Sequence, residues 1–220
     1  MFGLRLVLVL ASVASFAFAQ RPVSFPLLDH SAQVHADLYG EGTHALILAH
    51  GGRFDEKSWQ RQAPAFVNAG FLVLALRFRG DTYHDDGSPS AEGSTEDNAT
   101  DVLAALAYLH QIGANSVSAV GGSMGGDAVG EASIRSPGAI SRIVFLASAG
   151  PGAPEKVTGR KLFIVARNDN HLPGISERYA KAPQPKKFVL LDGSAHAQYL
   201  FETAEGPRLL NDILGFLTDP

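Results

Sequence analysis

Short apolar runs alternate along the chain with stretches whose apolar residues recur at helical spacing. Six of the runs are of strand length and mostly apolar, and the first is continuously apolar, which is typical of a strand covered on both faces: 45–49, 71–78, 117–120, 143–147, 162–166 and 188–191. Two further strands are expected near the start, at 23–28 and 33–39. The second of these alternates apolar and polar residues, which indicates one solvated face near a sheet edge.

Helical patterns fill most of the intervals between the expected strands. Helices are predicted at 56–69, between Ser94 and Gly113, and at 124–136, 176–180 and 207–217, with a Gly-, Asp-, Ser- and Pro-rich loop at 79–93. A strand pair followed by alternating strands and helices predicts a single α/β domain. Its sheet should be mostly parallel, with helices on both faces and right-handed crossovers.

The first 19 residues have the pattern of a secretory signal peptide. Arg5 precedes an apolar run, and Ala17 and Ala19 supply the small residues that a signal peptidase reads, so cleavage is expected after Ala19. The alternative is an uncleaved membrane anchor, but residues 6–19 fall short of the ~20 that a spanning helix needs. The mature domain is therefore expected to be residues 20–220, secreted or periplasmic, with no stable membrane insertion.

Composition narrows the function classes. Hydrophobic residues make up 45% of the chain and charged residues 18%, which excludes disorder and suits a large core. The formal net charge is −4 without a long basic run, so nucleic acid is not an expected partner. The chain has no cysteine, which removes disulfides, thiol catalysis and thiolate metal sites.

A glycine-rich turn surrounds Ser123 between an expected strand and an expected helix. The segment from Gly121 to Gly125 reads G-G-S-M-G and matches the G-x-S-x-G pattern of a serine nucleophile on a strained strand-to-helix turn. Small neighbours are needed there because side chains would collide with adjacent backbone. The plainer interpretation is an ordinary tight turn, so the motif needs support from elsewhere in the chain.

Two further loops after predicted strands supply that support. Asp169 follows the strand at 162–166 and could orient an imidazole, although an aspartate there could equally form a turn. His196 follows the last strand in a loop of small residues and could act as a general base. His171 is a rival base, but it lies two residues from Asp169, which leaves little room for orientation toward Ser123. The remaining histidines lie in unrelated elements without metal-ligand spacing: His30, His35, His44, His84 and His110.

A fourth loop, His50-Gly51-Gly52, follows the inner strand at 45–49. Glycines there would allow a backbone N–H to approach a substrate oxygen closely. The expected donors of an oxyanion hole are therefore the N–H groups of Gly52 and Met124, with Arg53 in place of Gly52 if the register differs by one. His50 is expected to be structural and to brace the loop.

With these motifs in the order oxyanion loop, Ser, Asp, His, the chain resembles the α/β-hydrolase family over about residues 23–217. The resemblance implies that Ser123 is the nucleophile, Asp169 the orienting acid and His196 the base. The short segment 148–160 leaves no room for the cap domain of larger members. The chain is therefore more similar to small esterases and dienelactone-hydrolase-like members, although dienelactone hydrolases proper use a cysteine nucleophile, which this chain lacks.

The expected function is that of a secreted serine hydrolase without cofactor or metal, acting on small or short-chain carboxylic esters. The site should be open, with walls from 79–93 and 148–160. Two alternatives remain: a peptidase or amidase on the same fold, for which the chain offers no gating domain, and a catalytically silent binding protein.

Overall fold

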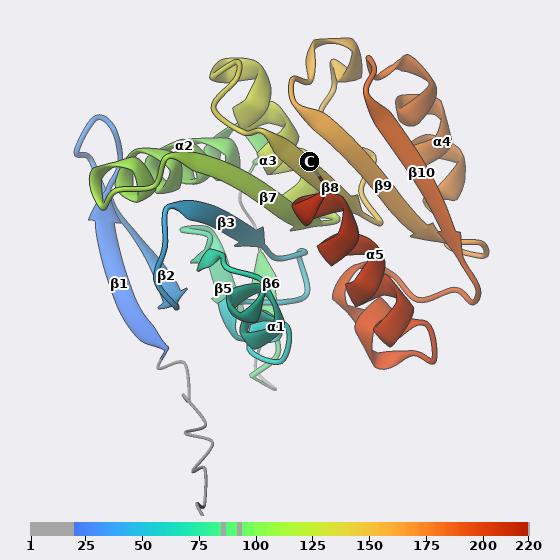
Figure 1. Cartoon of the computed structure of the whole chain (residues 1–220), viewed down its shortest axis with the longest axis horizontal. Coiled ribbons are helices and arrows are strands. Elements are labelled where there is room, and N and C mark those ends of the chain that lie inside the picture. The colour runs from blue at the N-terminus through green and yellow to red at the C-terminus, as the bar shows by residue number, and fades with distance from the viewer. Residues whose placement is uncertain (1–19, 85–86, 92–93, 220) are drawn as a thin grey trace, which may run out of the picture.

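The computed structural model describes residues 20–84, 87–91 and 94–219 (Figure 1). The predicted signal peptide, residues 1–19, lies outside these ranges. Within them, no helix combines the length and the apolar character needed to cross a membrane.

The centre of the molecule is an eight-stranded sheet with the strand order β1-β2-β4-β3-β7-β8-β9-β10. Only β2 runs against the others, so the sheet is mostly parallel, as predicted. The strands are β1 (Arg21–Pro26), β2 (Gln33–Tyr39), β3 (His44–Ala49), β4 (Leu72–Arg77), β7 (Ser116–Gly122), β8 (Arg142–Leu146), β9 (Arg160–Ala166) and β10 (Lys186–Leu191).

Helices cover both faces of this sheet (Figure 1). One face packs against α2 (Thr95–Gln111), α3 (Met124–Arg135) and α4 (Leu172–Lys181), and the other against α1 (Ala63–Asn68) and α5 (Gly206–Thr218). The strands divide their side chains between two hydrophobic clusters: Ile47 of β3 belongs to the first, and its neighbours Leu46 and Leu48 belong to the second. This alternation follows from the pleat of a strand and requires the continuous apolar runs of the sequence.

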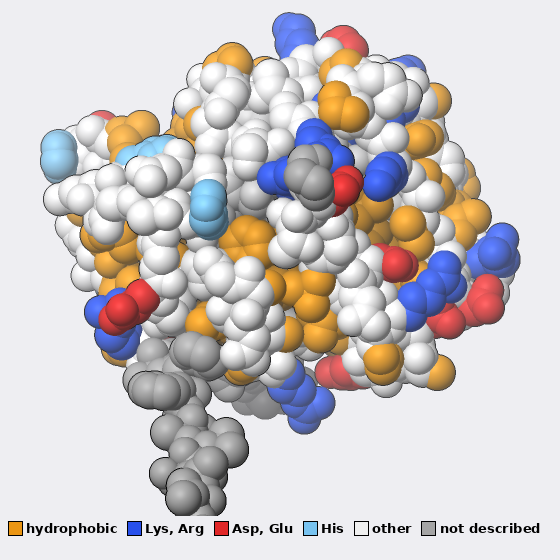
Figure 2. Space-filling model, viewed as in Figure 1, with side chains coloured by type: hydrophobic (Ala, Val, Ile, Leu, Met, Phe, Trp, Pro, Cys, Tyr) orange, Lys and Arg blue, Asp and Glu red, His pale blue; other side chains and the backbone are white. Residues whose placement is uncertain are grey.

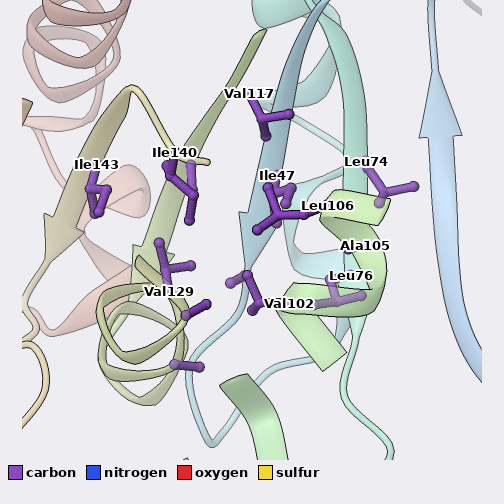
Figure 3. Close-up of a cluster of buried hydrophobic side chains, with 14 of the residues drawn as sticks. Ile47, Leu74, Leu76, Val102, Ala105, Leu106, Val117, Val129, Ile140 and Ile143 are labelled. Atoms are coloured by element: carbon purple, nitrogen blue, oxygen red, sulfur yellow. The ribbon is translucent and has the colours of Figure 1, made fainter. Parts of the chain in front are cut away.

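The first cluster joins the sheet to α2 and α3. In Figure 3 the side chains of Ile47, Val117 and Ile143, from three strands, converge with Val102 of α2 and Val129 of α3. All five side chains are 0–1% exposed. Each contributes about 1.5–3 kcal/mol by leaving water, so this layer stabilises the packing of the central strands against α2 and α3.

Two predicted segments differ from the structure. The helix expected at 56–69 is a 3₁₀ turn, Glu56–Trp59, followed by the separate helix α1. Asp55 caps the 3₁₀ turn by accepting from the N–H of Lys57, and Pro64, which lacks an N–H, lies in the first turn of α1, where no donor is needed. The loop expected at 79–93 contains a two-stranded hairpin of β5 (Asp81–Tyr83) and β6 (Pro89–Ala91).

The connection between β8 and β9 holds only one 3₁₀ turn, Pro154–Lys156, so no cap domain is inserted there, as predicted.

On the face shown in Figure 2, Lys and Arg side chains lie in small groups interspersed with Asp and Glu, and hydrophobic side chains lie between them.

Candidate active site

Four loops with polar residues meet at the carboxyl end of the sheet, where open α/β sheets bind their ligands. His50 follows β3, Ser123 follows β7, Asp169 follows β9 and His196 follows β10. Ala49 of β3 pairs with Gly121 of β7, so the first two loops leave the sheet side by side. The parallel order of the strands thus brings together residues that are up to 146 positions apart in the sequence.

Ser123 has the backbone strain expected of a nucleophile elbow. Its φ is 47° and its ψ is −117°, a left-handed conformation that side chains rarely adopt, and α3 begins at the next residue. A Cβ on Gly121 would lie 2.5 Å from the Cα of Gly126, and one on Gly125 would lie 2.5 Å from the carbonyl oxygen of His50. Both glycines are therefore needed for the backbone to close around Ser123.

A continuous line of hydrogen bonds runs from Ser123 to Asp169. The Oγ of Ser123 lies 2.9 Å from Nε2 of His196, whose Nδ1 lies 2.7 Å from Oδ2 of Asp169. The Asp169 side chain is only 2% exposed. Because an ionised carboxylate only accepts hydrogen bonds, Nδ1 of His196 is the donor to it and Nε2 is free to accept the serine proton.

The pKa of Asp169 is lowered although burial acts to raise it. The hydrogen bonds from the backbone N–H of His171 and from the His196 and His171 side chains outweigh that burial. Asp169 is therefore ionised at neutral pH and can stabilise a positive charge on His196.

His171 is the second imidazole on Asp169. Its Nδ1 lies 3.0 Å from Oδ1, and its backbone N–H also donates to Oδ1, at 2.9 Å. The His171 and His196 rings lie 4.5 Å apart between centroids and are tilted by 34°. His196 is thus the imidazole that contacts Ser123, and His171 lies beside it.

The loop after β3 is hydrogen-bonded to Gln198, a residue that the sequence did not indicate as part of the site. The buried Gln198 accepts from the N–H of Gly51 through Oε1, at 3.3 Å, and donates through Nε2 to Oγ of Ser58, at 3.2 Å. The N–H of Gly51 is therefore occupied. Gly52 lies next to Met124: a Cβ on Gly52 would be 3.9 Å from the sulfur of Met124.

His50 is fully buried beneath this loop. Its Nδ1 lies 2.9 Å from the carbonyl oxygen of Gly51, and its ring meets Phe78 edge-on at 5.0 Å between centroids. Its Nε2 lies 2.9 Å from Oδ2 of Asp81 in the hairpin, an ion-pair distance without the alignment of a directed hydrogen bond. These contacts join His50 to the loop after β3 and to the hairpin, and none of them involves Ser123.

A pocket of about 240 Å³ opens beside Ser123. Its lining comes from the loop after β3, from Ser123 and from the two histidine loops: Gly51, Gly52, Arg53, Phe54, Ser123, His171, His196, Ala197 and Tyr199. The expectation that 79–93 and 148–160 form its walls is wrong for the described residues. Ser148 donates to Asp127 at 2.8 Å and Pro151 packs against Gly130, so the second segment lies along α3.

Comparison with known proteins supports the fold through solved structures. No protein-family model matches the chain, and no curated protein matches it. Solved structures do match. A dienelactone hydrolase from Anabaena variabilis is 17% identical with a TM-score of 0.71, covering 90% of this chain and 96% of its own.

Two further solved structures match over a similar share of the chain. A predicted CIB-like hydrolase from Thermoplasma acidophilum is 17% identical with a TM-score of 0.72, covering 91% of this chain and 98% of its own. A carboxylesterase from Bacillus subtilis is 15% identical with a TM-score of 0.73, covering 93% of each chain. The chain therefore has the α/β-hydrolase fold over nearly its whole described length, and the predicted fold is confirmed.

Three residues around the site escaped sequence reasoning in different ways. Gln198 is a polar residue among apolar neighbours in a turn, and this contrast is the only sequence signal that could have pointed to its role in the site. Asp81 belongs to the segment that the sequence predicts as a loop, and nothing in the sequence relates it to His50. His171 was considered only as a competing base, because sequence spacing does not show that one carboxylate has an oxygen for each of two imidazoles.

Proposed function

We propose that this chain is a serine hydrolase that cleaves carboxylic esters through an acyl-enzyme, with Ser123 as nucleophile, His196 as base and Asp169 as orienting acid. The observation that carries the proposal is the line of hydrogen bonds at 2.9 Å and 2.7 Å that ends on a serine in a strained turn. Esterases and hydrolases among the matched structures agree with it.

In the first half of the reaction His196 takes the proton of Ser123 as its Oγ attacks the ester carbonyl. The developing oxyanion accepts from the N–H groups of Met124 and Gly52. Met124 suits this role because it is the first residue of α3, where backbone N–H groups have no partner within the helix. His196 then protonates the leaving alcohol, and water repeats the cycle on the acyl-enzyme.

The pocket favours small acyl groups. Its volume of about 240 Å³ is below the roughly 300–1,000 Å³ of sites for drug-sized ligands. Phe54 and Tyr199 form a tilted aromatic pair on one wall, with ring centroids 4.7 Å apart. An apolar wall next to the nucleophile suits a short acyl chain, and nothing in the described lining resembles a long channel for a lipid.

The decisive experiment compares native protein with the Ser123→Ala variant on p-nitrophenyl esters of rising chain length and on a matching amide. We expect the fastest turnover on the shortest esters, little on the amide, and loss of about 10⁶-fold in kcat for the variant. A fluorophosphonate probe should label native protein only. Absence of labelling would favour a binding protein, and faster amide cleavage would favour a peptidase or amidase.

We also propose that residues 1–19 direct export and that the mature chain begins at Gln20. The enzyme would then be secreted or periplasmic. The apolar run after Arg5 and the small residues Ala17 and Ala19 support this. Intact mass of the exported protein tests it: a chain that retains its first 19 residues would contradict the proposal.

A further inference from the structure

Asp169 is shared by two imidazoles, and the hydrolytic mechanism uses only one of them. His196 occupies Oδ2 through its Nδ1, and His171 occupies Oδ1 through its own Nδ1 and backbone N–H. Among the described residues, Asp169, His171 and His196 are the group of His and acidic side chains that could hold a metal ion. One potential ligand atom from each residue lies within 4.8 Å of the other two.

Two imidazoles and one carboxylate form a donor set that Zn²⁺ takes readily, with water completing a tetrahedral shell. Zinc–ligand bonds are about 2.0–2.2 Å long, so the three donor atoms must move somewhat closer to one another to bind the ion. The buried carboxylate of Asp169 is fixed, but the His171 side chain is 66% exposed and free to turn toward the ion. Both rings line the open pocket, so an ion from solvent can reach them.

The charges around this cluster are mixed. Asp127 interacts electrostatically with His171 and adds negative charge, whereas Arg178 of α4 and Arg53 of the pocket lining add positive charge. The ionised Asp169 is the one carboxylate in direct contact with both rings. Zn²⁺ binding therefore depends chiefly on the His171–Asp169–His196 group.

We propose that His171, His196 and Asp169 form a Zn²⁺ site whose occupation switches the hydrolase off. In the free protein each neutral ring presents its Nδ1 hydrogen to Asp169. When Nδ1 binds the ion instead, that hydrogen moves through solvent to Nε2, with no net change in bound protons. His196 then points an N–H at Ser123 and cannot accept its proton. The inhibition rests on the proposed esterase activity, whereas the binding does not.

The test compares Zn²⁺ inhibition of wild type, His171→Gln and the matched control His35→Gln, an exposed histidine on β2. Each rate is normalised to the same variant without metal. We expect inhibition of wild type and of the control that a chelator reverses, and a rise of at least about tenfold in the inhibitory concentration for His171→Gln. Mg²⁺, which prefers oxygen ligands, should not inhibit. An unchanged inhibitory concentration in His171→Gln would overturn the proposal.

Calorimetric titration with Zn²⁺ separates this proposal from the proposed function. Ser123→Ala should bind one ion as tightly as wild type, and His171→Gln more weakly, whether or not any ester is cleaved. One-to-one binding without esterase activity would overturn the proposed function alone. Hydrolysis without one-to-one binding would overturn the zinc site alone. If His171→Gln fails to fold by circular dichroism, His171→Asn replaces it in both measurements.

Discussion

Serine–histidine pairs lie at both ends of the central sheet, with almost the same distance between the two side chains. At the carboxyl end, Ser123 and His196 are 2.9 Å apart, beside a pocket of about 240 Å³. At the amino end, Oγ of Ser116 and Nδ1 of His44 are 2.8 Å apart, beside a pocket of about 280 Å³. Neither pocket size nor the presence of the two residue types separates the two ends.

Backbone strain and a buried carboxylate do separate them. Ser116 begins a regular strand, whereas Ser123 has a φ of 47° that lifts its hydroxyl above the strand end. His196 is fixed by Asp169, but no described carboxylate forms an ion pair with His44. A histidine without such a partner has no fixed tautomer and no stabilisation of its charged form. The comparison teaches that reactivity depends on how the pair is oriented and held.

Removing the carboxylate should make the carboxyl-end pair resemble the amino-end pair. We expect Asp169→Asn to keep the fold and to lower kcat on a short p-nitrophenyl ester by about 10⁴-fold, because the amide no longer selects the tautomer that accepts the serine proton. Steady-state kinetics at neutral pH measures this. As controls, Ser116→Ala and His44→Ala should retain wild-type rates. If either control fell as far as Asp169→Asn, the distinction between the two ends would be wrong.

Much of the fold was predictable because buried parallel strands have continuous apolar sequences that few other elements share. The failures have local physical causes. At 56–69 the apolar spacing is helical across the whole segment, and the cap at Asp55 and the proline at 64 divide it. Hairpin β5–β6 is too short to show an alternating pattern, so the segment from Arg79 was predicted to be a loop.

The candidate site was predictable where chemistry demands a sequence pattern. Only small residues fit around Ser123, and loops after parallel strands must share one edge, so Asp169 and His196 could be located. The pocket walls were not predictable, because they depend on which way a loop turns after leaving the sheet. Ser148 turns toward Asp127 and donates a hydrogen bond to it, and no sequence pattern predicts this contact.

Gln198 offers a smaller test of how the carboxyl end is held. Replacing it by Leu removes the acceptor for the N–H of Gly51, and we expect the loop with Gly52 to shift relative to Met124. If those N–H groups stabilise the oxyanion, kcat should fall by about 10²-fold with little change in KM, because such donors act mainly in the transition state.

A matched control is Ser58→Ala, which removes only the partner of Nε2 of Gln198 and leaves the Gly51 contact in place. We expect a clearly smaller loss of kcat in this variant. A rise in KM with unchanged kcat in Gln198→Leu would instead mean that the residue shapes the ground-state pocket and does not position the oxyanion loop.

The smallest effect concerns Asp127, a half-buried carboxylate on α3 near the carboxyl end of the sheet. Burial raises the pKa of Asp127 to about 6, and the hydrogen bonds from Ser148 and Gly150 only partly oppose this. Asp169 is shifted in the opposite direction, because three hydrogen bonds outweigh its burial. The folded pKa of Asp127 lies above its unfolded value of 3.8, so its stabilising contribution is complete below that value and is lost as pH rises through about 6.

Asp127→Asn should remove this pH dependence while keeping an acceptor for Ser148. The Tm of the variant minus that of wild type should therefore become more positive between about pH 4 and about pH 7.5, by roughly 2–4 °C for each kcal/mol of relieved cost. Thermal unfolding by circular dichroism measures it. Asp192→Asn, which alters an exposed aspartate, should give a difference that is flat with pH. A flat difference for Asp127→Asn as well would mean that its carboxylate is solvated and that burial does not set its charge.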